Sequence, residues 1–266
     1  MLVLKAVCLG IVEGVTEFLP VSSTGHLIVA AAAVDYPQAS RQTFEIFIQL
    51  GAILAVVWNF RQHLLDLLVR SPSDASARHT LGAVLLAFLP AAAAGFLFHK
   101  PIEEYLFSPT FVAVTLIVGG VALIVLERRP WHFSVSDIER TSWQQALWIG
   151  VAQVLSLLPG VSRAGATIVG AMAVGLNRPA AAQFSFYLSI PTLFAASLYS
   201  LFKARHDLVA SDALALAIGF VAAFLSALVV VRGFVGFVQR HDFTGFGYYR
   251  IGAGILILAL VRAAWI

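Results

Sequence analysis

The amino-acid sequence predicts an all-α polytopic membrane protein, built as an inverted-topology repeat with about six spanning helices and two re-entrant helix hairpins. Apolar residues make up 60% of the 266-residue chain and charged residues only 12%, a balance that a water-soluble domain of this size would not need. The mean hydropathy of +0.89 agrees with this class. A segment near the N-terminus also recurs 140 residues later, which indicates one structural unit built twice.

The repeated segment covers residues 10–29 and 150–169 without a gap. Each copy is an apolar run interrupted by proline, serine and glycine, and each carries polar or charged side chains that lipid would reject. We therefore expect two helix hairpins that enter the membrane and turn back. The identical positions are Gly10/Gly150, Val21/Val161, Ser22/Ser162, Gly25/Gly165, Ile28/Ile168 and Val29/Val169.

Six other apolar runs are long enough to cross a hydrocarbon core of about 30 Å, which takes about 20 helical residues. With three spans in each repeat, we expect the second copy to be upside down relative to the first, so that the two hairpins meet near the midplane. The chain is assigned to a single membrane domain, 1–266, with repeats at approximately 1–130 and 141–266. The predicted spans are 44–60, 81–98, 111–126, 180–202, 213–231 and 248–265.

Basic residues in the predicted loops indicate the orientation, because cytoplasmic loops carry an excess of Lys and Arg. Ten arginines, Arg250 among them, fall on one face of the predicted topology, and six Lys or Arg residues fall on the other. We expect the first face to be cytoplasmic and the first hairpin to open outward, with a dual or reversed topology as the alternative. Glu13, Glu17 and Pro20 interrupt the N-terminal apolar run, so we do not expect a cleaved signal peptide.

The charge and cysteine content argue against a nucleic-acid-binding protein and exclude an internal disulfide. The net charge is only +3, and the basic residues are spread over loops rather than gathered in a patch with aromatic residues. We therefore expect no nucleic-acid partner. Cys8 is the only cysteine, which excludes an internal disulfide.

Glu13 and Glu17 place two carboxylates inside an apolar run. Because they are four residues apart, they share one face of a helix about one turn apart, where like charges repel unless a cation or a proton lies between them. A solvated helix face is the alternative, but the flanking residues are apolar on all sides. Ionisable groups at membrane depth are usually functional, so we interpret the pair as part of a site.

The first break in the repeated segment is rich in hydroxyl groups. After Pro20 come Ser22, Ser23 and Thr24, any of which can cap a new helix whose free N–H groups point back toward the break. Such a helix start suits a phosphate, although an ordinary Ser/Thr cap at a turn explains these residues equally well. His26 follows Ser23 by three residues, which predicts that its ring reaches that hydroxyl as a base reaches a nucleophile.

The second break carries Arg163, the only strongly basic residue in the repeated segment. An unpaired guanidinium at membrane depth costs about 2.5 to 3.5 kcal/mol on insertion scales. Its planar fork suits either a carboxylate or a phosphate. The alternative is that Arg163 extends to the membrane interface. We expect Arg163 to face the first break.

The charges of this site narrow the class of ligand. Two carboxylates and one guanidinium leave a net charge of about −1, which would repel a phosphate. A divalent metal on Glu13 and Glu17 would make the site an anion receptor and polarise a phosphorus–oxygen bond. The sequence therefore predicts phosphoryl chemistry on a lipid headgroup, with the metal and the base on one hairpin and Arg163 on the other.

The motifs resemble those of the undecaprenyl-pyrophosphate phosphatases, also called bacitracin-resistance proteins. They are EGVTE at 13–17, PVSSTGH at 20–26 and PGVSRAGAT at 159–167, and the resemblance extends over nearly the whole chain. It implies a multi-pass enzyme of the bacterial inner membrane that removes the terminal phosphate of undecaprenyl pyrophosphate. That reaction returns the carrier lipid to peptidoglycan synthesis, and bacitracin resistance is the expected linked phenotype.

The resemblance also implies a requirement for Mg²⁺ or Ca²⁺ and roles for residues at matching positions. The family commonly has Ser where this chain has Ala164, so a role for that hydroxyl is either dispensable or supplied by Ser162. The implied roles are catalysis for Glu17, Ser23, His26 and Arg163, metal binding for Glu13 and Glu17, and substrate binding for Ser22, Ser23, Ser162, Arg163 and Thr167.

The sequence does not decide which group attacks the phosphorus. Ser23 activated by His26 would give a covalent phosphoenzyme, whereas metal-bound water would displace the phosphate directly. We expect a polyprenyl pyrophosphate substrate, contact with membrane lipids, an active site that opens to the periplasmic side, and a homodimer as one candidate assembly.

Two other functions fit the pattern. A transporter or flippase with a midplane broken-helix site would share the inverted repeats, and it would move its substrate without releasing phosphate. If the polar hairpins only hold the repeats together, Glu17→Gln and Arg163→Ala would reduce stability rather than turnover.

Overall fold

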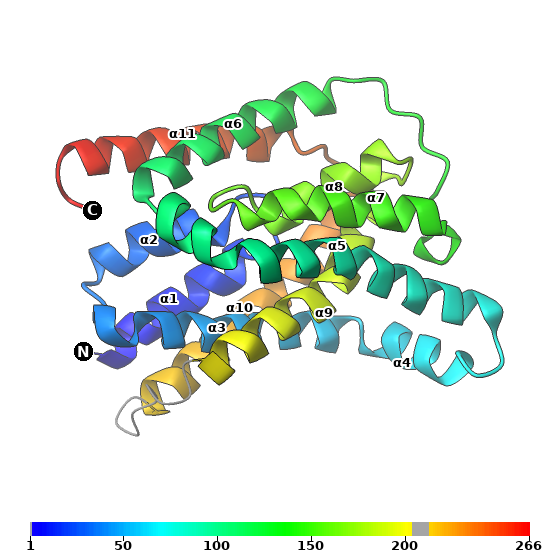
Figure 1. Ribbon diagram of the computed structural model, residues 1–266, viewed down its shortest axis with the longest axis horizontal. Helices are drawn as coiled ribbons and strands as arrows, with labels where there is room; N and C mark the ends of the chain where they lie inside the picture. Colours follow the sequence, from blue (N-terminus) through cyan, green and yellow to red (C-terminus); the bar gives the residue numbers. More distant parts are fainter. Residues whose placement is uncertain (1, 204–212) are drawn as a thin grey trace.

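The computed structural model describes residues 2–203 and 213–266, which are almost entirely helical (Figure 1). Among these residues the β-type pairing is limited to an isolated bridge between Val135 and Leu176. The all-α prediction is confirmed. The helices are α1 Leu2–Thr16, α2 Ser23–Ala33, α3 Gln38–Asn59, α4 Arg61–Arg70, α5 Ala75–Leu106, α6 Pro109–Glu127, η1 Ile138–Arg140, α7 Trp143–Val154, η2 Leu155–Leu157, α8 Arg163–Ala173, α9 Arg178–Lys203, α10 Ala213–Phe237 and α11 Thr244–Arg262.

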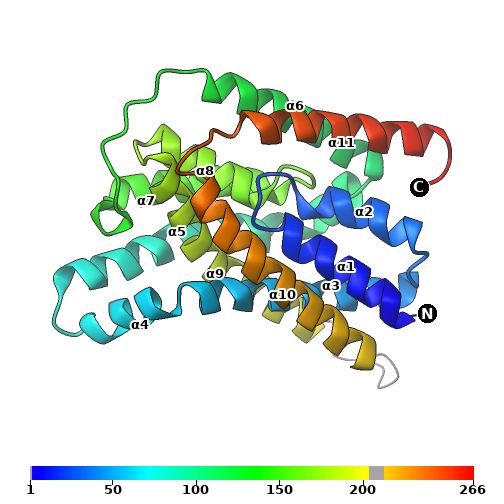
Figure 2. The same ribbon diagram turned by 180° about the vertical axis from the view of Figure 1, so that it is seen from behind.

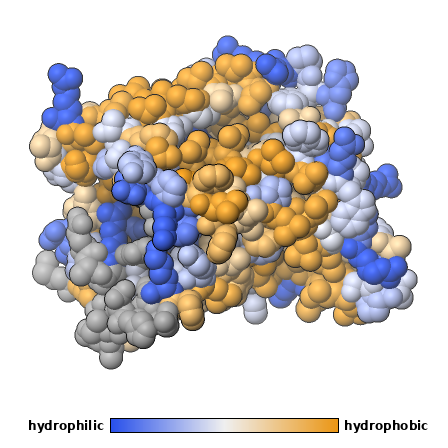
Figure 3. All heavy atoms as spheres, in the orientation of Figure 1, coloured by the Kyte–Doolittle hydropathy of each residue, from blue (hydrophilic) through white to orange (hydrophobic). Residues whose placement is uncertain are grey.

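Five of the described helices, α5, α6, α9, α10 and α11, are long and apolar enough to cross a membrane. A sixth candidate is the pair α3 and α4, whose axes differ by 69°. Each predicted span falls on one of these helices, and the run 44–60 ends where α3 bends into α4. Apolar side chains cover the central part of one face, with hydrophilic ones mainly at its periphery (Figure 3). The multi-pass membrane class is confirmed.

Apart from α4 and the single turns η1 and η2, four helices, α1, α2, α7 and α8, are shorter than a span. They contain 15, 11, 12 and 11 residues, so at 1.5 Å per residue none reaches the roughly 30 Å of a hydrocarbon core. They form two successive pairs, each interrupted by an irregular break (Figure 2). The first break is 17–22, and the second is 158–162, which follows η2.

Glycine at the repeated position 10/150 lets two pairs of helices approach closely. A Cβ at Gly10 would collide with the carbonyl oxygen of Gly219 in α10, and a Cβ at Gly150 would collide with that of Ala87 in α5. Each glycine thus removes the side chain where its helix meets a long neighbour. This close packing gives a physical reason for the glycine that the two copies share.

Helix α9 lies against both α3 and α8. Its first half is almost entirely buried, and it supplies hydroxyl groups beneath the second break. The fold therefore surrounds the two breaks with α6, α9 and α11, which hold them in the interior (Figure 2).

Candidate active site

The two breaks share an unusual backbone conformation. Ser22 has φ 69° and Ser162 has φ 72°, and each directly precedes the helix that follows its break. The left-handed region is rare for residues with a Cβ, and such strain is concentrated at functional sites. The same conformation at corresponding serines shows that the two breaks have the same local shape.

The two serines make different side-chain contacts. Ser162 Oγ accepts a hydrogen bond from the Gly165 N–H at 3.1 Å and so caps the start of α8. Ser162 also donates to the Leu19 carbonyl at 3.4 Å, so the two breaks touch directly. Ser22 occupies the same position before α2, but its side chain makes no capping bond.

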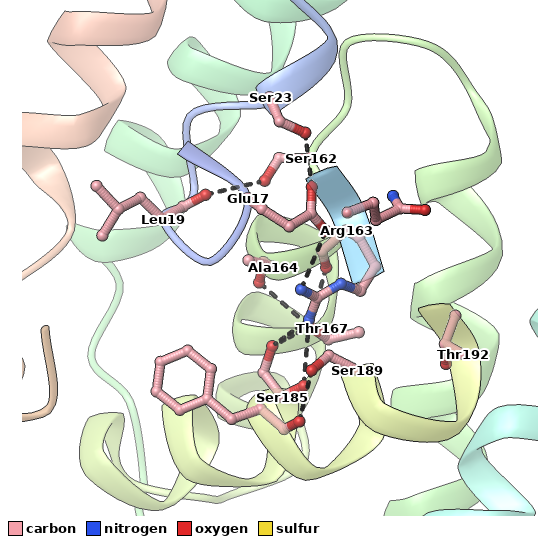
Figure 4. Close-up of polar contacts among 12 residues, drawn as sticks. Glu17, Leu19, Ser23, Ser162, Arg163, Ala164, Thr167, Ser185, Ser189 and Thr192 are labelled. Carbon is pink, nitrogen blue, oxygen red and sulfur yellow. Dashed lines mark hydrogen bonds and ion pairs between the residues drawn. The ribbon is translucent and has the colours of Figure 1, made fainter. Parts of the chain in front are cut away.

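Glu17 and Arg163 meet in the interior and form a buried ion pair. Arg163 Nη2 lies 3.3 Å from Glu17 Oε1, and both side chains are about 7% exposed. The Ser23 hydroxyl donates to the second oxygen of the same carboxylate, Oε2, at 2.6 Å (Figure 4). The expected approach of the acidic break to the basic one is therefore present, and it includes a hydroxyl that can give up its proton to Glu17.

Helix α9 orients the guanidinium from the other side. Arg163 Nη1 donates to the Ser185 carbonyl at 3.2 Å and to its hydroxyl at 3.4 Å. The Ser185 hydroxyl also lies 2.6 Å from that of Thr167, and the Arg163 guanidinium lies over the ring of Phe18 at 5.5 Å. Arg163 Nε is buried without a partner, which leaves one donor for a ligand.

Ser185 was not predicted as a site residue. The signal that could have found it is a pair of hydroxyls four residues apart, Ser185 and Ser189, on one face of a largely apolar helix. Both are fully buried. The Ser185 hydroxyl bonds across to Thr167 of α8, whereas that of Ser189 donates to the Phe186 carbonyl of its own helix.

Glu13 faces a cavity of about 700 Å³ beside the ion pair. Its side chain is only 2% exposed. The cavity has a polar end, formed with Ser23 and with an Arg41–Glu45 pair whose Nε and Oε1 are 2.8 Å apart. Five apolar side chains also line it. The remaining lining residues are Thr24, Leu27, Ile28, Ile46, Gln49, Phe107, Pro109 and Ser200.

His26 does not make the expected contact with Ser23. Its Nδ1 lies 2.7 Å from the Ser22 carbonyl, and its Nε2 lies 2.6 Å from the Tyr249 hydroxyl, whose ring stacks on it. Because a carbonyl only accepts, Nδ1 carries the proton and Nε2 accepts from Tyr249. Both ring nitrogens are thus engaged, while the Ser23 hydroxyl is bonded to Glu17.

Gln153 corresponds to Glu13 in the second copy and is fully buried. Its Oε1 accepts from the Thr192 hydroxyl at 3.3 Å, and its Nε2 has no partner. Glu13, the acidic residue of the pair, therefore faces the cavity, and Gln153, the neutral one, contacts α9.

The described side chains alone supply too few ligands for a divalent cation, so a bound phosphate would have to complete its coordination. Within residues 2–203 and 213–266, no group of three or more His, Cys, Asp or Glu side chains is placed to hold a metal. Glu17 already pairs with Ser23 and Arg163. Glu13 is the carboxylate that faces the cavity. Mg²⁺ is commonly bound by one or two carboxylates together with waters and substrate phosphates, so the donor set suits an ion that arrives with a phosphate.

Arg250, predicted to be a loop residue, lies instead in the interior. It is 2% exposed, and its guanidinium contacts both breaks. The charge counted from the motifs therefore left out a buried arginine that touches both breaks.

The chain is similar to one protein family over most of its length. The family model described as bacitracin resistance protein BacA matches residues 6–256. The undecaprenyl-diphosphatase of Nitrosospira multiformis is 50% identical over 257 residues, which are 97% of this chain and 94% of that protein. Undecaprenyl-diphosphatase 2 of Rhodospirillum rubrum is 49% identical over 265 residues, or 99% and 96% of the two chains. Undecaprenyl-diphosphatase 1 of Pseudomonas fluorescens is 44% identical over 263 residues, or 99% and 95%.

Proposed function

The chain belongs to the bacitracin resistance protein BacA family and is an undecaprenyl-diphosphatase, and we propose that its reaction takes place where Glu17, Ser23 and Arg163 meet. The family resemblance predicted from the motifs is confirmed. The observation that carries the proposed site is the buried contact of Ser23 and Arg163 with the two oxygens of one carboxylate. This contact joins a nucleophile, a proton acceptor and a phosphate-binding cation.

The phosphate end of the substrate is held by the second break and by the start of α2. Arg163 offers a planar fork and the unpartnered Nε. The start of α2, which has no side-chain cap, offers N–H groups to an anion, whereas at α8 the Gly165 N–H is already bonded to Ser162. Ser22, Ser162 and Thr167 shape these helix starts. The apolar side chains that line the cavity beside Glu13 take the first prenyl units.

Glu17 is the base in the proposed reaction. As the Ser23 oxygen attacks the terminal phosphorus, its proton passes to Glu17 Oε2, to which it already donates at 2.6 Å. The bond from that phosphorus to the bridging oxygen breaks, and undecaprenyl phosphate leaves. Water then hydrolyses the phosphoserine and releases orthophosphate. In the alternative route, Glu17 takes the proton of a water that attacks the phosphorus directly.

Bound Mg²⁺ or Ca²⁺ would neutralise phosphate charge and polarise the phosphorus–oxygen bond. Glu13 is the residue best placed to hold it, with Glu17 as the second carboxylate. His26 is proposed to act indirectly, because its bond to the Ser22 carbonyl fixes the backbone next to Ser23.

We further propose that the two broken segments are re-entrant hairpins of an inverted-topology repeat. Three features support this: each of α1, α2, α7 and α8 is too short to span by itself, the strained serines of the two breaks correspond, and an odd number of candidate spans separates the two pairs. The excess of arginine on the predicted cytoplasmic face supports a site that opens to the periplasm. Cysteine labelling from outside at Ala33→Cys, which ends α2, tests that orientation.

Phosphate release by purified protein tests the proposed site. Protein in detergent is given undecaprenyl pyrophosphate or a C15 pyrophosphate with Mg²⁺, and orthophosphate is measured with and without chelator. We expect release by the wild type, and a loss of at least 100-fold in Glu17→Gln and Arg163→Gln that fold normally. Movement of the lipid across liposomes without orthophosphate would instead support a transporter.

Trapping an intermediate distinguishes the two routes. Acid quenching of the reaction with substrate labelled in the terminal phosphate should give a phosphoserine at residue 23, which Ser23→Ala abolishes. Thr24→Ala is the matched control, since Thr24 lies next to Ser23 at the same cavity. Substantial turnover by Ser23→Ala without any phosphoenzyme would favour direct attack by water.

A further inference from the structure

Arg250 is a buried arginine that is paired with carbonyl groups rather than with an acid. It is only 2% exposed and lies one and a half turns or so into α11. In the described part of the chain its hydrogen-bond acceptors are all backbone oxygens. They are those of Pro20 at 3.3 Å, Thr115 at 3.4 Å, Leu116 at 3.4 Å, Gly160 at 3.1 Å and Val161 at 2.9 Å.

Three of these acceptors belong to the two breaks. A carbonyl at the end of a helix has no helical N–H partner, and at membrane depth water does not replace it. Pro20 lies in the first break, and Gly160 and Val161 lie in the second. A guanidinium offers five N–H groups in one plane, so a single side chain can satisfy several converging carbonyls, whereas a lysine ammonium offers three from one point.

Helix α6 is shaped to receive the same guanidinium. The carbonyls of Thr115 and Leu116 accept from Arg250 as well as from their own helix, because residues 119 and 120 are glycines. A Cβ at Gly119 would collide with Arg250 Nη2. The space for the guanidinium therefore depends on the absence of that one atom.

The position of Arg250 is repeated in the other half of the chain. Helices α6 and α11 both contain 19 residues, and Thr115 occupies in α6 the place that Arg250 occupies in α11. The Thr115 hydroxyl donates to the Pro159 carbonyl of the second break at 2.6 Å. Thr115 and Arg250 thus each donate a hydrogen bond to a carbonyl of the second break. Of the two, only Arg250 also bonds to the first break.

We propose that Arg250 is a positioning residue, which fixes the first break against the second and so sets the distance between Ser23 and Arg163. Its acceptors lie just before residues of the proposed site. Pro20 comes two residues before Ser22, and Val161 directly precedes Ser162 and Arg163. This inference rests on the proposed function, since the alignment of the breaks matters to turnover only if one phosphate is held between them.

The test measures turnover and the separation of the breaks in the same variants. Arg250→Met removes the donors, Arg250→Lys keeps the charge, and Gly119→Ala displaces the guanidinium without removing it. Spin labels at Ala33→Cys and Ala173→Cys, the exposed last residues of α2 and α8, report the distance between the two halves in a Cys8→Ser background.

Matched controls lie on the same helix as Arg250. Arg262→Met removes an exposed arginine of α11, and Gly252→Ala adds a Cβ that meets nothing within 4 Å. We expect Arg250→Met and Gly119→Ala to lower kcat at least tenfold with a smaller change in KM, and to shift or broaden the spin-label distance. Arg250→Lys should fall between these and the wild type, and both controls should match the wild type.

Three outcomes would overturn the proposal. One is a wild-type kcat in both Arg250→Met and Gly119→Ala. The second is a loss of kcat with an unchanged distance distribution in both. The third is that both variants lose only folded protein, while the folded fraction keeps full kcat per molecule. If the wild type releases no orthophosphate at all, the proposed function fails, and the distance measurement still decides whether Arg250 holds the breaks together.

Discussion

Glu17 and Arg163 are 146 positions apart in the chain, yet their side chains form one buried ion pair with an Oε1–Nη2 distance of 3.3 Å. Removing one partner of a buried pair leaves an uncompensated charge, which typically costs about 3 to 5 kcal/mol. The pair therefore bears on stability as well as on the proposed chemistry, and experiments must separate the two contributions.

A double-mutant cycle separates these contributions. Glu17→Gln and Arg163→Gln should each lower the unfolding midpoint in detergent, and the double variant should recover much of the loss because no charge is left unpaired. Orthophosphate release should stay at least 100-fold below wild type in all three. Recovery of activity in the double variant would mean that the pair only holds the two halves together.

Glu13→Gln should raise the Mg²⁺ concentration needed for half-maximal turnover by about tenfold or more, because a carboxylate that faces the cavity is lost. Titration of Mg²⁺ against orthophosphate release measures the shift. Glu45→Gln is the control in the same cavity, and its carboxylate already pairs with Arg41. Equal shifts in the two variants would contradict the assignment of the ion to Glu13.

Tyr249→Phe removes the hydroxyl that donates to His26 Nε2. One neutral hydrogen bond is worth about 0.5 to 1.5 kcal/mol, so we expect kcat to fall roughly 2- to 13-fold. Tyr248→Phe, on the neighbouring exposed tyrosine, should have no effect. If Tyr249→Phe turns over at the wild-type rate while His26→Gln does not, the orientation of the ring by Tyr249 is unimportant.

Gly150→Ala should destabilise the fold by about 1 to 3 kcal/mol, because the new Cβ would collide with the Ala87 backbone. Gly233→Ala, in α10 with nothing near its Cβ, should be neutral or stabilise by up to about 1 kcal/mol. Thermal unfolding in detergent compares the two. A stabilised Gly150→Ala would show that α7 and α5 are less closely packed than described here.

The carboxylate of Glu139, in η1, should make stability depend on pH. A hydrogen bond from Arg70 at 2.7 Å lowers the pKa of Glu139 below its ordinary value. Its stabilising effect is therefore complete above the unfolded-state pKa of about 4.3 and is lost as the pH falls through the lower folded-state value. Glu139→Gln should lose about 0.5 to 1 kcal/mol at pH 7 and lack this acid dependence. Glu104→Gln, an exposed control, should behave like the wild type.

Hydropathy and the internal repeat predicted much of this structure. The six apolar runs became the spanning candidates because burial in lipid depends on composition, which is read directly from the chain. The meeting of Glu17 and Arg163 followed from the correspondence of the two breaks, since an isolated charge at membrane depth needs a partner.

Contacts made by other helices were not predictable in the same way. Tyr249 is 223 positions from His26, and the pairing depends on how α11 packs against α2. Arg250 was assigned to a loop because it lies at the edge of an apolar run, where an arginine usually reaches water. Its carbonyl acceptors are set by backbone geometry in three distant segments, which side-chain identities do not encode.

The positive φ angles of Ser22 and Ser162 have a practical consequence. A left-handed residue with a Cβ costs about 1 to 2 kcal/mol, and glycine avoids that penalty. Exchange of either serine for glycine keeps the turn and deletes both the Cβ and the hydroxyl, whereas alanine deletes only the oxygen and retains the penalty. Glycine therefore tests the hydroxyl without the backbone penalty. A Ser162→Gly enzyme that is more stable than its parent but slower would show that the serine is kept for rate at the expense of stability.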